Sequence, residues 1–274
     1  MECIVKGLKL HYQCHGEGEP ILLLHGFYPD HRLMAGCMEP VLHENGYKRI
    51  YLDLPGMGQS ESASWLKSAD EMLEIVLAFI ERLLPGEDFL LAGESYGGYL
   101  ARGIVRRLEK RVTGLFLLCP CIVAQSERRT LPPHAVLRRD AALLAQLPPE
   151  DMPGYAAMAV VQSKETWRRY EKEVLPGLKL ADADFLKRFE VQGYAFSFPV
   201  DQGVRYQKPT LILTGRQDDC VGYQDAWQLL EQYPRATFAV LDRAGHNAQI
   251  EQPELFNALL KEWLARVQEG QLDI

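Results

Sequence analysis

The chain has 274 residues, of which 47% are hydrophobic and 24% charged, and its formal net charge is −7. This length and composition allow one substantial buried core, and a negative net charge without clustered Lys and Arg disfavours nucleic acid as a partner. The chain has no apolar run of the roughly 18 residues that a membrane helix needs, and its first residues lack the pattern of a secretion signal. We therefore expect no membrane span and, by default, a cytoplasmic protein.

Strands and helices are predicted to alternate along the chain. Two short alternating runs, 3–6 and 8–14, are joined at Gly7 and favour a hairpin at the edge of a sheet. Such alternation is typical of a mostly parallel sheet with helices on both faces, whose functional residues gather at the carboxyl ends of the strands. Apolar runs predict the further strands at 21–25, 49–53, 89–93, 114–119, 210–214 and 237–241.

The segment that precedes the strand at 210–214 has a different character. Helical patterns over 140–147 and 155–174 are interrupted by Pro148-Pro149 and Pro153-Gly154. Connections of this length are uncommon without a function. We expect a helical cap over residues 122–207, inserted into a core domain of residues 1–121 and 208–274. The candidates for lining a substrate pocket there are Met158, Trp167, Tyr170 and Phe196.

The run Gly93-Glu94-Ser95-Tyr96-Gly97 stands between a predicted strand and a predicted helix. In this context G-x-S-x-G is typical of a serine nucleophile on a sharp turn, where strand and helix pack too closely for larger flanking residues. The pattern predicts Ser95 as a nucleophile. We expect Glu94 to be buried and to have its hydrogen bonds satisfied by the backbone or by a neighbouring side chain.

A serine hydroxyl needs a histidine base and an acid that orients the histidine. Gly245-His246 follows the strand at 237–241, on a loop suited to a general base. Asp218, in Gly215-x-x-Asp218, follows the strand at 210–214 and lies between serine and histidine in the chain order. We prefer Asp218 to the adjacent Asp219, which we expect to be a solvated loop charge.

Acyl transfer also needs N–H donors for the developing oxyanion. The amide of Tyr96, directly after the serine, is the first predicted donor. The second is the amide of Phe27, in the His25-Gly26-Phe27 turn after the strand at 21–25. We expect His25 to buttress this turn and not to act as a base.

These motifs and the run 53–60 occur in the order that the α/β-hydrolase superfamily uses, and the chain resembles that superfamily from about residue 22 to residue 253. The resemblance implies an α/β-hydrolase fold, an acyl-enzyme mechanism and a turn-stabilising role for Asp53. It implies a triad of Ser95, Asp218 and His246 and an oxyanion hole from the amides of Phe27 and Tyr96.

We expect a serine hydrolase that cleaves a small to medium, hydrophobic carboxylic ester. Thioesterase, lactonase and C–C bond hydrolase stay open on the same triad, as do a non-hydrolytic lyase and a slow-turnover ligand receptor. Glu94-Ser95-Tyr96 also resembles serine carboxypeptidases, whose length and disulfide framework this chain lacks. The cysteines are scattered without zinc-site spacing, so we predict no metal and no cofactor. The sequence fixes no oligomeric state, and a homodimer is one arrangement it allows.

Overall fold

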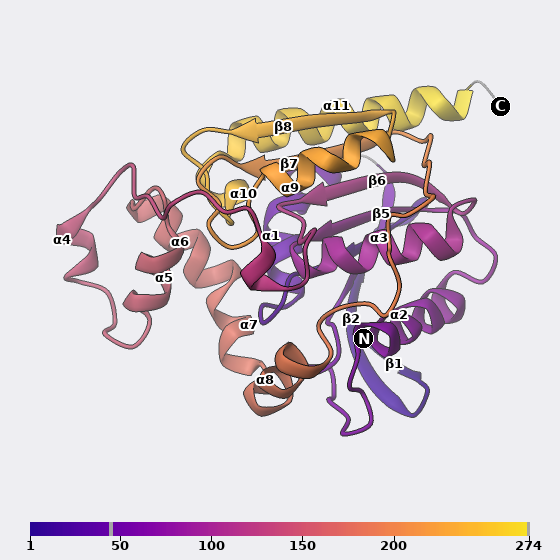
Figure 1. The fold of residues 1–274 in the computed structure, drawn as a ribbon, viewed down its shortest axis with the longest axis horizontal. Coiled ribbons are helices and arrows are strands. Elements are labelled where there is room, and N and C mark those ends of the chain that lie inside the picture. Colours follow the sequence, from indigo (N-terminus) through magenta and orange to yellow (C-terminus); the bar gives the residue numbers. More distant parts are fainter. Residues whose placement is uncertain (44–45, 273–274) are drawn as a thin grey trace.

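The computed structural model describes residues 1–43 and 46–272, and its core is one eight-stranded sheet with the order β1-β2-β4-β3-β5-β6-β7-β8 (Figure 1). β1 and β2 form the antiparallel edge, and the strands from β3 onward run parallel. The predicted mostly parallel sheet is confirmed. The strands are β1 (Glu2–Val5), β2 (Leu8–His15), β3 (Glu19–Leu24), β4 (Tyr47–Leu52), β5 (Phe89–Glu94), β6 (Val112–Leu118), β7 (Thr210–Gly215) and β8 (Ala236–Leu241).

The central strands are apolar because helices cover both of their faces. Every residue of β5 is buried, as is every residue of β3 after Glu19. The register pairs Leu24 at the end of β3 with Gly93 in β5, and Glu94 at the end of β5 with Leu118 in β6. Parallel pairing therefore brings the loops that follow these strands to one edge of the sheet.

Four long helices form the two outer layers. α1 and α11 pack against each other and against the central strands, while α2 and α3 pack together on the opposite face (Figure 1). Ser68 begins α2 with a reciprocal capping box to Glu71. No helix among residues 1–43 and 46–272 is long and apolar enough to cross a membrane. The bounds are α1 (His31–Leu42), α2 (Ala69–Leu83), α3 (Tyr96–Leu108) and α11 (Pro253–Leu272), with the short α9 (Gln224–Trp227) and α10 (Ala248–Glu251) between β7 and α11.

The segment between β6 and β7 carries a series of short helices joined by loops and lies beside the carboxyl ends of the strands (Figure 1). The continuous pattern predicted over 155–174 is wrong, because residues 159–163 leave the helix. Glu251 accepts the amides of Val160 and Val161 at 2.6 and 3.0 Å, and Ser163 caps the next helix. The elements here are α4 (Ala141–Leu144), α5 (Met152–Met158), α6 (Lys164–Glu173), α7 (Leu175–Leu180) and α8 (Ala183–Gln192).

Candidate active site

Ser95 occupies the turn between β5 and α3 in a strained backbone conformation, with φ 51° and ψ −115°. The turn is so tight that a Cβ at Gly93 would lie 2.4 Å from the carbonyl oxygen of Gly97. A Cβ at Gly97 would lie 2.4 Å from the carbonyl oxygen of Leu24. These short distances explain why glycine stands two residues before and two residues after the serine. The strained turn places the serine hydroxyl at the edge of the sheet.

Three side chains from distant parts of the chain meet at this turn. His246 Nε2 lies 2.9 Å from Ser95 Oγ, and its Nδ1 lies 2.9 Å from Asp218 Oδ2. The other oxygen of Asp218 accepts the amides of Cys220 and Val221. The neighbouring Asp219 turns away to His134. The arrangement is that of a nucleophile, a base and an orienting acid.

The buried carboxylates around His246 make it a strong base. Burial by itself lowers the pKa of His246, but the charge and hydrogen bond of Asp218 and the charge of Glu94 raise it to about 9. Burial raises the pKa of Asp218, yet His246 and the two backbone amides hold it below its ordinary value. Asp218 is therefore ionised at neutral pH and can stabilise an imidazolium on His246.

The loop after β3 passes beside the serine. A Cβ at Gly26 would lie 3.0 Å from Ser95 Cβ, so only glycine allows this approach. The amides of Phe27 and Tyr96 donate no hydrogen bond to another described residue. His25 is fully buried; its Nε2 accepts the amide of Leu54 at 3.0 Å, and its Nδ1 donates to the carbonyl oxygen of Gly26. His25 thus supports the loop, and both of its ring nitrogens are engaged by backbone groups.

A cavity of about 540 Å³ opens onto His246. Met158 lines this cavity, whereas Trp167, Tyr170 and Phe196 lie outside it. Trp167 and Tyr170 pack on Tyr155, and Phe196 stacks on an aromatic ring of α3. These three side chains are buried in the interior of the protein and do not face the cavity. The lining includes Phe27, Tyr28, Glu127, Arg129, Met158, Glu190, Tyr194, Cys220 and His246.

Comparison with known proteins agrees with this geometry. A family model described as the alpha/beta hydrolase family matches residues 21–259. The chain belongs to this family. It is therefore a hydrolase of the alpha/beta hydrolase family.

Relatives span nearly the whole chain. A crystal structure of an alpha/beta superfamily hydrolase from Oenococcus oeni has a TM-score of 0.88 and 31% identity, and the match covers 98% of this chain and 99% of that one. A 2-hydroxy-6-oxononadienedioate/2-hydroxy-6-oxononatrienedioate hydrolase from Paraburkholderia phymatum is 29% identical over 94% of this chain and 92% of its own length. A thermophilic esterase from Thermogutta terrifontis, at 22% identity and a TM-score of 0.70 over 97% of this chain and 98% of its own, shares the fold.

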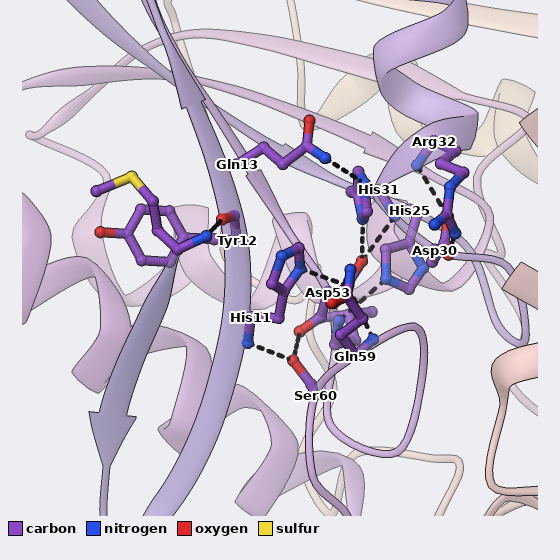
Figure 2. Close-up of polar contacts among 12 residues, drawn as sticks. His11, Tyr12, Gln13, His25, Asp30, His31, Arg32, Asp53, Gln59 and Ser60 are labelled. Carbon is purple, nitrogen blue, oxygen red and sulfur yellow. Dashed lines mark hydrogen bonds and ion pairs between the residues drawn. The ribbon is translucent and has the colours of Figure 1, made fainter.

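In this alpha/beta hydrolase, Asp53 holds the loop after β3 in place (Figure 2). The buried carboxylate lies 2.7 Å from Nδ1 of His31 and 2.9 Å from Nδ1 of His11, and it accepts the amides of His31 and Gln59. Gln13 donates to the other nitrogen of His31 at 2.7 Å. Asp53 thereby ties β2 and the turn after β4 to the first residue of α1, directly after the loop that carries Phe27.

Asp53→Asn is expected to lower the free energy of unfolding by about 3 kcal/mol, because the amide group would face N–H donors that now bind a buried carboxylate. Burial alone would raise the pKa of Asp53, but the hydrogen bond and charge of His31 and the amide of Gln59 hold it well below its ordinary value. The carboxylate thus stabilises the fold above the unfolded pKa of about 4, and this contribution declines as the pH falls below that value. Urea unfolding at neutral and acid pH measures both effects; equal stabilities at neutral pH would contradict the role.

One charged residue of the site was not foreseen, and the prediction for a second holds only in part. Arg129 lines the cavity, where it donates to the carbonyl oxygens of Val123, Ala124 and Cys220. The position of Arg129 depends on contacts between segments that are distant in the chain, so no local sequence pattern indicates it. Glu94 is buried as predicted, and its Oε1 lies 3.3 Å from His246 Nε2, but among the described residues its Oε2 has no hydrogen-bond partner.

Proposed function

We propose that this hydrolase cleaves a small to medium, hydrophobic carboxylic ester through an acyl-enzyme. The observation that carries the proposal is the continuous contact from Ser95 Oγ through both nitrogens of His246 to Asp218. In this role Ser95 is the nucleophile, His246 the general base and Asp218 the residue that orients it. The division into a core and a cap over 122–207 is part of the same proposal.

The first half of the reaction forms the acyl-enzyme. His246 Nε2 takes the proton of Ser95 as Oγ attacks the ester carbonyl, and the amides of Phe27 and Tyr96 bind the oxyanion. Neither amide donates to an acceptor within residues 1–43 and 46–272, which leaves both N–H groups available for this purpose. His246 then gives the proton to the departing alkoxide, which leaves as an alcohol.

The second half releases the acid. Water enters the place of the alcohol, His246 takes one of its protons, and the resulting hydroxide attacks the acyl carbon. Collapse of the second tetrahedral intermediate breaks the bond to Ser95 Oγ, which recovers its proton from His246. The contact of 2.9 Å between Ser95 and His246 carries the first and the last of these proton transfers.

The cavity supports a substrate of modest size. Its volume of about 540 Å³ suits a small molecule, and the rings of Phe27, Tyr28 and Tyr194 with the thioether of Met158 provide apolar contacts. We propose Met158 as a substrate contact. Trp167, Tyr170 and Phe196 are not proposed as contacts, because they lie outside the cavity.

A panel of para-nitrophenyl esters with lengthening acyl chains tests the proposal. We expect kcat/KM to rise from acetate to a medium chain and then to fall, because the cavity is finite. Thioesters and lactones of matched acyl size belong in the same panel. No hydrolysis of any ester, with turnover of another class, would contradict the proposed ester specificity.

Hydrolysis of a C–C bond is a second candidate, because the Paraburkholderia phymatum relative is named a 2-hydroxy-6-oxononadienedioate hydrolase. Turnover of 2-hydroxy-6-oxo-dienoates with kcat/KM above that of every ester would favour it. Reaction in H₂¹⁸O separates both hydrolases from a lyase, since hydrolysis places solvent oxygen in the acid product.

A further inference from the structure

Glu94 contacts the catalytic histidine, yet the proposed reaction gives it no part. Its Oε1 lies 3.3 Å from His246 Nε2, the same nitrogen that lies 2.9 Å from Ser95 Oγ. The side chain of Glu94 is 2% exposed. His246 therefore has a buried carboxylate on each nitrogen, Asp218 on Nδ1 and Glu94 on Nε2.

The surroundings of Glu94 leave its charge poorly compensated by other groups. Among the described residues Oε2 has no hydrogen-bond partner, and it lies so close to the loop after β3 that a Cβ at Gly26 would be 2.2 Å away. Burial raises the pKa of Glu94 to about 7, while the charge of His246 and, less strongly, the backbone of Gly26 lower it and the charge of Asp218 raises it. A positive His246 is thus the main support for an ionised Glu94.

Other ionisable groups also face His246. Cys119 and Asp218 lie beside it, and Cys220 lines the same cavity. Burial raises the pKa of both thiols, so they stay neutral at neutral pH. Arg129 opposes the carboxylates, because its charge disfavours a protonated His246. Besides the orienting Asp218, Glu94 is the negative group that acts most strongly on this histidine.

We infer that Glu94 is a positioning residue that competes with Ser95 for the proton on His246 Nε2 and stabilises the protonated histidine. The inference rests on the proposed function. Ionised Glu94 stabilises the imidazolium in the resting site, so Ser95 cannot give up its proton there. After that resting proton is lost at higher pH, the same carboxylate stabilises the imidazolium that forms as Ser95 attacks. Glu94 therefore moves the onset of activity to higher pH and raises the maximal kcat.

Glu94→Gln removes the charge and keeps the size of the side chain. We expect the acid limb of kcat/KM to move to lower pH by about one unit or more, since an adjacent charge shifts a pKa by that amount. We also expect kcat at the alkaline plateau to fall about tenfold, as one charge contact to the imidazolium is lost. Both changes are needed to support the inference, because a merely structural role of Glu94 would lower kcat without moving the acid limb of kcat/KM.

The pH profile is measured with para-nitrophenyl butyrate from about pH 5 to about pH 10 for wild type, Glu94→Gln and Asp219→Asn. Asp219→Asn is the matched control, because it removes one charge beside the triad from a partly exposed side chain paired with His134. Its acid limb should coincide with that of the wild type. If Glu94→Gln does not fold, Glu94→Asp withdraws the carboxylate from Nε2 and should shift the limb in the same direction.

NMR titration of His246 in histidine-labelled protein separates the inference from the proposed function, because it needs no turnover. A lower titration midpoint in Glu94→Gln than in wild type is the expected result. Equal midpoints and coincident acid limbs would overturn the inference even if the wild type is an active esterase. An inactive wild type with a shifted midpoint would overturn the proposed function and leave the Glu94–His246 contact established.

Discussion

Ser95→Ala is expected to lower kcat for ester hydrolysis by about 10⁵-fold or more, because removal of a triad nucleophile leaves only binding and the oxyanion hole. Ser95 Oγ is held 2.9 Å from His246 Nε2 at the tip of a strained turn, and no other hydroxyl among the described residues contacts that nitrogen. Steady-state kinetics with the preferred ester of the panel measures the loss.

The same variant should keep its fold. Within the part of the chain that the structure describes, the side chain of Ser95 hydrogen-bonds only to His246, so its removal takes no support from the sheet. Unchanged far-ultraviolet circular dichroism and an unchanged melting temperature are the control. A folded Ser95→Ala enzyme with wild-type kcat would show that Ser95 is not the nucleophile.

Asp218→Asn is expected to lower kcat by about 10⁴-fold, since an amide cannot hold the histidine tautomer whose Nδ1–H faces the acid. Both carboxylate oxygens are in use: Oδ2 contacts His246 and Oδ1 accepts the amides of Cys220 and Val221. The Asn side chain can place its oxygen toward the amides and its NH₂ toward His246. The fold is then kept while the base is misoriented.

The adjacent Asp219→Asn tests the choice between the two aspartates. Asp219 contacts His134 and not His246, so we expect kcat within about twofold of wild type for this surface change. Kinetics of the two variants, measured side by side, decide the assignment. A large loss in Asp219→Asn together with an active Asp218→Asn would reverse it.

The sequence predicted the sheet and the meeting of Ser95, Asp218 and His246 because both depend on local patterns. Apolar runs fall on the strands, and the motif residues follow directly at their carboxyl ends. Parallel pairing then brings those ends together whatever lies between them. Short local signals are therefore sufficient for this part of the molecule.

The cavity lining and the role of Glu94 depend on contacts between distant segments, which no local pattern contains. Tyr170 and Met158 look equally apolar in the sequence, yet the first packs on Tyr155 and the second faces the cavity. The helix predicted over 155–174 breaks because Glu251, about ninety residues later, accepts two of its amides. Such outcomes are decided by tertiary structure.

The most direct test of the catalytic centre is treatment of the wild type with a fluorophosphonate, followed by mass spectrometry of the labelled peptide. Ser95→Ala is treated in parallel. We predict one adduct on Ser95 in the wild type and none in the variant, because only a serine activated by a base reacts at phosphorus. An adduct on another residue, or equal labelling of Ser95→Ala, would contradict the assignment of Ser95 as the nucleophile.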